Sequence, residues 1–95
     1  MRIVAVDMSA SKGSVALVDQ GSVRASFSWE EKRENRQQLF DALKALAIDW
    51  SSVDQFVVGR GPGAFSGMRI AFSVVNALAA PDKTPVVAHN SGAAV

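Results

Sequence analysis

The feature that most constrains the fold is an apolar strand joined through a glycine-rich loop to an apolar helix. The run Phe56-Val57-Val58 predicts a buried strand, and the loop "GRGPGAFSG" follows from Gly59 to Gly67. Residues Arg69 to Ala80 then predict a helix, which Pro81 ends because proline cannot continue it. A strand, tight turn and helix in this order indicate an α/β domain, in which helices pack on a sheet.

The other elements follow from hydrophobic periodicity and turn residues. Alternating apolar residues at the start of the chain predict a hairpin and a third strand, and acidic residues at Glu30-Glu31 favour the beginning of a helix. The predicted order is strands at Ile3 to Val6, Ser14 to Val18 and Ser22 to Ser28, a helix with Leu39, Phe40, Leu43, Leu46 and Ala47 on its apolar face, a strand at Phe56 to Val58, a helix at Arg69 to Ala80 and a strand at Pro85 to Ala88.

The composition fits one small folded domain. The chain has 95 residues, of which 48% are hydrophobic and 20% charged, a balance that argues against disorder. A net charge of +1, with no basic cluster beyond Lys32-Arg33 and Arg36, does not support independent nucleic-acid binding. The sequence has no cysteine, no signal-peptide pattern and no run near the ~20 apolar residues of a membrane helix. We therefore expect a cytoplasmic protein.

The glycine loop does not fit the two best-known phosphate-binding motifs. A Walker loop needs lysine after its last glycine, whereas Met68 follows Gly67. The spacing of Gly59, Gly61 and Ala64 formally satisfies a dinucleotide loop, but the acidic residue that should end the next strand is missing, because Asp82 precedes that strand.

Two interpretations of the loop remain open. It is a tight corner, with Ser66 capping a helix that begins near Gly67, or it places backbone N–H groups at a helix N-terminus to bind an anion. Asp7 and Ser9 after the first strand are candidates for the same site, although such residues also bond their own turns. The candidate anion or nucleotide site comprises Asp7, Ser9, Arg60, Gly61, Gly63 and Arg69.

The helix after the loop is apolar over an arc of roughly 200 degrees, more than one sheet face can cover. Such a helix must bury a second side against another helix of the chain or against another protein. We find no nucleophile beside a base and no cluster of metal ligands around the single His89, so the residues themselves do not predict catalysis. They favour an interaction domain.

Four segments resemble the TsaB (YeaZ) family, the partner subunit in bacterial biosynthesis of the tRNA threonylcarbamoyladenosine modification. They are "RIVAVDMSASKGSVALVDQG", "RENRQQLF", "VVGRGPGAFSGMRIA" and "PVVAHNSGAA". The resemblance implies an actin-like, ribonuclease-H-like domain with a mixed sheet of three antiparallel strands, further strands and flanking helices. It also implies that residues 1–95 form the N-terminal lobe of a protein with a second lobe.

The resemblance further implies a non-catalytic subunit that pairs through its two helices with a TsaD-like subunit, joined by a TsaE-like ATPase. It implies a homodimer when TsaD is absent, contact with tRNA only through the complex, and no cofactor of its own, although ATP or ADP with magnesium would bind in the complex. The residues implied in the partner interface are Leu39, Leu43, Ile70, Val74, Val75 and Leu78. Two alternatives remain: a nucleotide-binding ATPase-like fragment, glycoprotease-like by older naming, and a self-associating domain without a tRNA role.

Overall fold

The computed structural model describes residues 1–8, 12–30, 36–60 and 65–89 of the chain. Side chains are described for these residues except at positions 36–37, 60, 65–68 and 89. The predicted order of strands and helices is confirmed. The elements are β1 (Arg2–Met8), β2 (Lys12–Asp19), β3 (Ser22–Glu30), α1 (Arg36–Ala45), the short 3-10 helix η1 (Trp50–Ser52), β4 (Gln55–Arg60), α2 (Phe65–Ala79), the 3-10 helix η2 (Ala80–Asp82) and β5 (Val86–His89).

The strands form one mixed sheet in the order β3-β2-β1-β4-β5. The first three strands are antiparallel neighbours, whereas β4 runs parallel to both β1 and β5. Helix α1 lies in the connection from β3 to β4, and α2 lies in the crossover from β4 to β5. The β2–β3 connection is a two-residue turn in which Gln20 (φ 52°) and Gly21 (φ 79°) both have positive φ. Positive φ at both central residues is what a type I′ hairpin requires, and this turn fixes the register of the hairpin.

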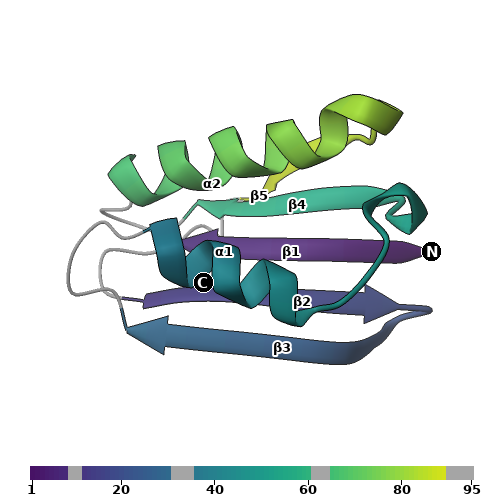
Figure 1. Ribbon diagram of the computed structural model, residues 1–95, viewed down its shortest axis with the longest axis horizontal. Coiled ribbons are helices and arrows are strands. Elements are labelled where there is room, and N and C mark those ends of the chain that lie inside the picture. Colours follow the sequence, from purple (N-terminus) through teal and green to yellow (C-terminus); the bar gives the residue numbers. More distant parts are fainter. Residues whose placement is uncertain (9–11, 31–35, 61–64, 90–95) are drawn as a thin grey trace.

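Both helices lie on the same face of the sheet (Figure 1). Along β1, β2 and β4 every second side chain is buried, which is the strand period with one face turned to the helices. Phe56 in β4 and Leu39 in α1 are the largest fully enclosed side chains of this core. The hydrophobic core of the described residues thus lies between the sheet and the two helices. No helix described in the chain is long and apolar enough to cross a membrane.

Several predicted boundaries differ from the structure, among them those at Glu30, Ser66 and Ala47. Glu30 is the last residue of β3 rather than the start of a helix, because it continues the strand that pairs with Lys12. Helix α2 begins at Phe65, so Ser66 lies inside the first turn and is not the residue that precedes the helix. Ala47, predicted on the apolar helix face, lies beyond the end of α1 and is exposed.

The position of Ala47 leads to a stability prediction. Its φ of 52° places it in the left-handed region, where a side chain is unfavourable and where glycine usually ends a helix. We expect Ala47→Gly to raise the free energy of unfolding by about 0.5 kcal/mol, because relief of backbone strain exceeds the entropy that glycine adds to the unfolded chain. Urea unfolding followed by circular dichroism measures this change.

Ala77→Gly is the matched control, since Ala77 is also exposed but lies inside α2 with helical backbone. There glycine should lower the free energy of unfolding by about 0.5–1 kcal/mol. A loss of stability in both variants would contradict the role assigned to the left-handed backbone at Ala47.

Candidate functional site

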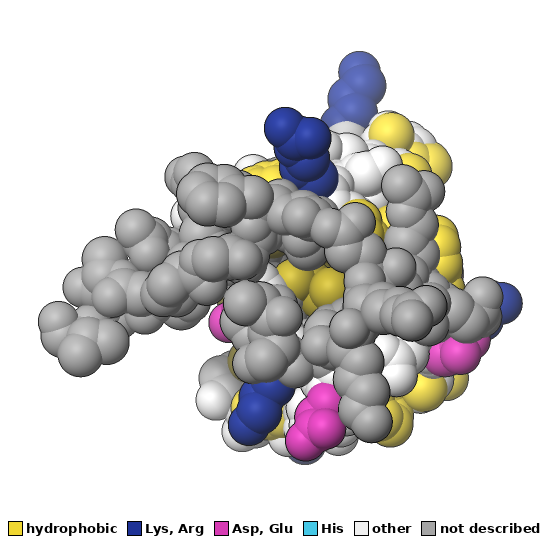
Figure 2. Space-filling model, turned by 90° about the vertical axis from the view of Figure 1, so that its left-hand side faces the viewer, with side chains coloured by type: hydrophobic (Ala, Val, Ile, Leu, Met, Phe, Trp, Pro, Cys, Tyr) yellow, Lys and Arg dark blue, Asp and Glu magenta, His cyan; other side chains and the backbone are white. Residues whose placement is uncertain are grey.

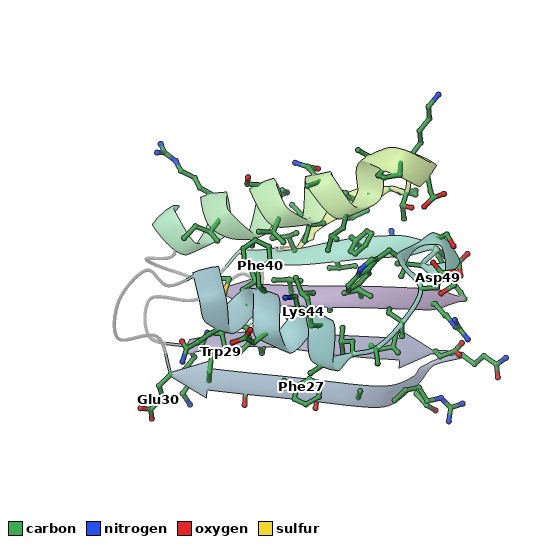
Figure 3. The ribbon with its side chains drawn as sticks, viewed as in Figure 1. Phe27, Trp29, Glu30, Phe40, Lys44 and Asp49 are labelled. Atoms are coloured by element: carbon green, nitrogen blue, oxygen red, sulfur yellow. The ribbon has the colours of Figure 1, made fainter. Side chains whose placement is uncertain are left out.

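A groove of about 310 Å³ lies between α1 and α2. It is open to solvent at the surface, and Phe40 points from α1 toward α2 across it (Figure 3). Its lining is apolar apart from one lysine and one serine, which suits apolar side chains of a ligand or partner. The residues that line it are Phe40, Leu43, Lys44, Trp50, Ile70, Ser73, Val74, Ala77 and Leu78.

The groove exists because the two helices lie over different strands. Helix α1 packs mainly on β2 and β3, whereas α2 packs mainly on β4 and β1, so the helices diverge instead of packing against each other along their length. The side chains that α2 turns toward the gap at Ser73 and Ala77 are small and do not fill it. Divergent helices and small side chains together leave an apolar hollow above the core.

Trp50 forms one wall of the groove. Its ring contacts Phe56 of the core, and its backbone belongs to the capped 3-10 helix η1. Its ring lies 6.2 Å from that of the buried Phe56 between centroids, with a tilt of 34°. Asp49 caps η1 by accepting hydrogen bonds from the hydroxyl and the amide of Ser51, at 2.7 Å and 3.0 Å. Both hydrogen bonds lower the pKa of Asp49, and the bond from the Ser51 hydroxyl has the larger effect. The indole therefore has a defined position at the groove.

The structure brings together four of the six residues predicted in a partner interface. Leu43, Ile70, Val74 and Leu78 all line the groove. Leu39 and Val75 are 0% exposed and belong to the core, so they present no surface to a partner. The groove thus contains four of the six predicted residues, and the partner interface itself stays a prediction.

Sequence reasoning missed part of the groove. Phe40 was expected on the apolar face of the first helix but not in the interface, yet it is 42% exposed. The signal was helical spacing, because Phe40, Leu43 and Lys44 follow one another at i, i+3 and i+4, and Ser73 and Ala77 are four residues apart. Trp50 carried no such signal, since it lies on a separate 3-10 turn.

The excess apolar surface of the second helix is mostly enclosed within the chain. We expected more of it to need a companion, but Ile70, Ala71, Val74, Val75 and Ala79 are buried in the hydrophobic core. Phe72 and Leu78 are half-buried and Ala77 is exposed. What remains for a partner is the groove itself and its rim.

The groove carries one charge among its lining residues, that of the exposed Lys44. An ammonium group at the edge of an apolar hollow favours a carboxylate on the partner, beside apolar side chains that fill the hollow. The groove thus combines an apolar lining with a single positive charge.

The candidate anion site is only partly within the described residues. Asp7, at the carboxyl end of β1, is half-buried and lies opposite Gly59 of β4. A Cβ atom on Gly59 would lie 2.7 Å from Cγ of Asp7, so any other residue at position 59 would displace the Asp7 carboxylate. Arg69 is exposed on α2. Ser9, Gly61, Gly63 and the side chain of Arg60 lie outside the described residues, so the nucleotide site stays a prediction.

Figure 2 views the molecule from the end where β1 and β4 finish. Among the side chains described there, basic groups stand at the top of the view, and acidic and basic groups both lie around hydrophobic ones in its lower half. Within residues 1–8, 12–30, 36–60 and 65–89, no group of three or more histidine, cysteine or acidic residues is placed to hold a metal ion.

Comparison with known proteins relates the chain to tRNA modification proteins. Residues 33–95 match the family model described as TsaD, tRNA N6-adenosine threonylcarbamoyltransferase. The chain is 33% identical over 91 residues to the tRNA threonylcarbamoyladenosine biosynthesis protein TsaB of Escherichia coli, covering 92% of this chain and 39% of that protein.

Solved structures show the same relation. The YeaZ structure from Pseudomonas aeruginosa is 38% identical and superposes with a TM-score of 0.78, over 94% of this chain and 43% of YeaZ. The chain therefore spans less than half the length of these relatives. RuvC from Thermus thermophilus, at 11% identity and a TM-score of 0.59, is similar in fold alone. These neighbours confirm the predicted actin-like, ribonuclease-H-like fold.

Proposed function

The chain belongs to the family of TsaD, tRNA N6-adenosine threonylcarbamoyltransferase, as a TsaB/YeaZ-type sequence, and from this premise we propose that it acts in threonylcarbamoyladenosine modification of tRNA. In this proposal it is a non-catalytic subunit that docks on a TsaD-like catalytic subunit. The docking surface is the groove between α1 and α2. A TsaE-like ATPase joins the assembly, and tRNA is bound by the complex.

The observation that carries the docking proposal is the open apolar groove. Phe40 and Trp50 supply aromatic surface at the groove, and aromatic side chains are enriched among the residues that dominate binding energy. Ser73 and Ala77 allow the partner's backbone to come close to α2. A helix of the partner laid between α1 and α2 would place apolar side chains in the hollow and an acidic side chain near Lys44.

The proposal is tested first by mixing the chain with its cognate TsaD-like protein at micromolar concentration and separating the mixture by size-exclusion chromatography. Co-elution is expected. In cells depleted of the chain, mass spectrometry of hydrolysed tRNA should show a fall in threonylcarbamoyladenosine that the chain restores. Separate elution would overturn the docking proposal, and an unchanged level of the modified nucleoside would remove the tRNA role.

A further inference from the structure

Strand β3 is an edge strand of the sheet. It lies at one end of the order β3-β2-β1-β4-β5, and no strand among the described residues pairs with its outer side (Figure 1). Backbone N–H and C=O groups on that side are therefore available to another strand. Natural proteins block such edges with charges, proline or bulges, because an open edge pairs with other chains.

Strand β3 has such blocking features only toward its ends. A β-bulge lies at Arg24, where the pairing of β3 with β2 shifts by one residue. Glu30 places a second charge at the last position of the strand (Figure 3). Between these two charges, residues 25–29 contain neither a charge nor a proline, and Phe27 is 39% exposed. The middle of the edge is thus open for pairing.

The sequence of this open stretch is nearly symmetrical about Phe27. A serine lies on each side of it, at positions 26 and 28. The next positions outward hold a small residue, Ala25, and a large one, Trp29. The outermost positions hold the two opposite charges, Arg24 and Glu30, and both side chains are exposed. A second copy of the same strand, running in the opposite direction, would therefore present matching residues.

Two copies of β3 in antiparallel register about Phe27 form a complementary pair at each position. The pairs are Phe27 with Phe27, Ser26 with Ser28, Ala25 with Trp29, and Arg24 with Glu30. Aromatic pairs, hydroxyl pairs and pairs of opposite charge are the cross-strand contacts that stabilise antiparallel sheets. A shift of the register by two residues in either direction would place a serine opposite Arg24 or opposite Glu30, so the charges specify this register.

The geometry of the two copies allows this pairing. Phe27 lies opposite the buried Val15, on the face that carries the helices, so a Phe27 pair places the helices of both copies on the same face. Helix α1 contacts β2 more than β3. The two β2 strands would lie three strand spacings apart, about 14 Å. Two α1 helices, each about 10–12 Å in diameter, fit above them, with the Phe27 side chains between them.

We propose that the chain forms a two-fold symmetric dimer in which the β3 edges of two copies pair antiparallel about Phe27. The two five-stranded sheets become one continuous sheet. Glu30 of each copy lies between Lys12 of its own β2 and Arg24 of the second copy. Helix α2 packs on β4 and β1, away from β3, so the groove stays open to a TsaD-like subunit. This interface differs from the helix-mediated homodimer that the family resemblance implies.

Charge reversal tests the proposed register. Two-fold symmetry makes the pair of Arg24 and Glu30 occur twice, so Arg24→Glu or Glu30→Arg alone brings like charges together at both ends of the interface. Each variant should raise the dissociation constant of the dimer at least about tenfold, measured by sedimentation equilibrium. An equimolar mixture of the two variants should restore dimerisation, because each supplies the charge that the other has lost. Asp82→Arg, an exposed reversal in η2, is the matched control and should leave the constant unchanged.

The absence of cysteine from the chain permits a second test. Phe27→Cys places two thiols across the two-fold axis, where opposed Cα atoms lie about 4.5–5.5 Å apart, within the range of a disulfide. Ser73→Cys places an exposed thiol at the groove instead. Under mild oxidation we expect a covalent dimer of Phe27→Cys and none of Ser73→Cys on non-reducing gels.

Three results would contradict the β3 dimer. The first is a chain that sediments as a monomer at its highest soluble concentration. The second is a failure of the mixed charge variants to dimerise, or equal weakening by Asp82→Arg, since the contact would then not depend on the pair of Arg24 and Glu30. The third is a covalent dimer of Ser73→Cys without one of Phe27→Cys, which would place the contact at the groove. None of these measurements contains a TsaD-like subunit, so failure here leaves the docking proposal standing.

Discussion

Replacing Ala77 with arginine is expected to weaken binding of the TsaD-like subunit by at least about 100-fold, or roughly 2.7 kcal/mol. Ala77 lines the groove but is itself exposed, so the substitution changes the docking surface without disturbing the core. Titration of the labelled TsaD-like subunit by fluorescence anisotropy measures the dissociation constant directly.

The size of this effect follows from what arginine does inside the groove. Its side chain would enter a hollow of about 310 Å³ that the partner's apolar side chains would otherwise fill. A guanidinium group buried in an apolar interface without a carboxylate costs several kcal/mol. The neighbouring Lys44 has the same sign, and the one acidic side chain proposed for the partner is already paired with it, so no carboxylate is left for the new charge.

Asn76→Arg is the matched control, because Asn76 is the preceding residue of α2, is also exposed and does not line the groove. The two residues differ by about 100 degrees around the helix axis, so the control adds the same charge to another side of α2. Both variants should unfold at nearly the same temperature as the original chain. Equal weakening by the two substitutions, or unchanged binding by Ala77→Arg, would show that the groove is not the docking surface.

Much of the fold was accessible from the sequence because its elements have clear periods. The alternation from Ser22 to Ser28, the continuous run at Phe56 to Val58 and the apolar helix ended near Pro81 all predict their structures directly. The boundaries of the elements were harder to predict from the sequence. An acidic residue such as Glu30 occurs both at the end of a strand and at the start of a helix. Pairing with Lys12 across the sheet decides it.

The candidate site was only partly accessible for a different reason. Helical periodicity shows which side of α2 is apolar, but not how much of that side the sheet and α1 enclose. Val75 and Leu78 have the same apolar character in the sequence, yet the first is fully buried and the second lines an open groove. The difference arises from the divergence of the two helices over separate strands, and no local pattern encodes it.

The largest stability effect is expected where β2 meets β3. Gly13 lies opposite Trp29 on the face covered by α1, and a Cβ atom on Gly13 would clash with Cε2 and Cζ2 of the indole. Trp29 packs against the hydrophobic core. We expect Gly13→Ala to lower the free energy of unfolding by about 2 kcal/mol, because the indole must leave its place. For a domain of this size that corresponds to a fall of about 10 °C in the unfolding temperature, measured by far-ultraviolet circular dichroism.

A double-mutant cycle separates this clash from a general intolerance of the strand. In the chain that already carries Trp29→Ala, Gly13→Ala meets no indole, so it should cost nothing and even add slight stability, since alanine restricts the unfolded chain more than glycine does. Ser14→Ala, on the opposite face of β2, should change stability by less than about 0.5 kcal/mol. Additive losses in the double variant would mean that Gly13 is required by the backbone and not by Trp29. Helix α1 packs on both β2 and β3, so displacement of the indole should also change the position of α1 at the groove. We therefore expect Gly13→Ala alone to weaken partner binding more than its loss of stability explains.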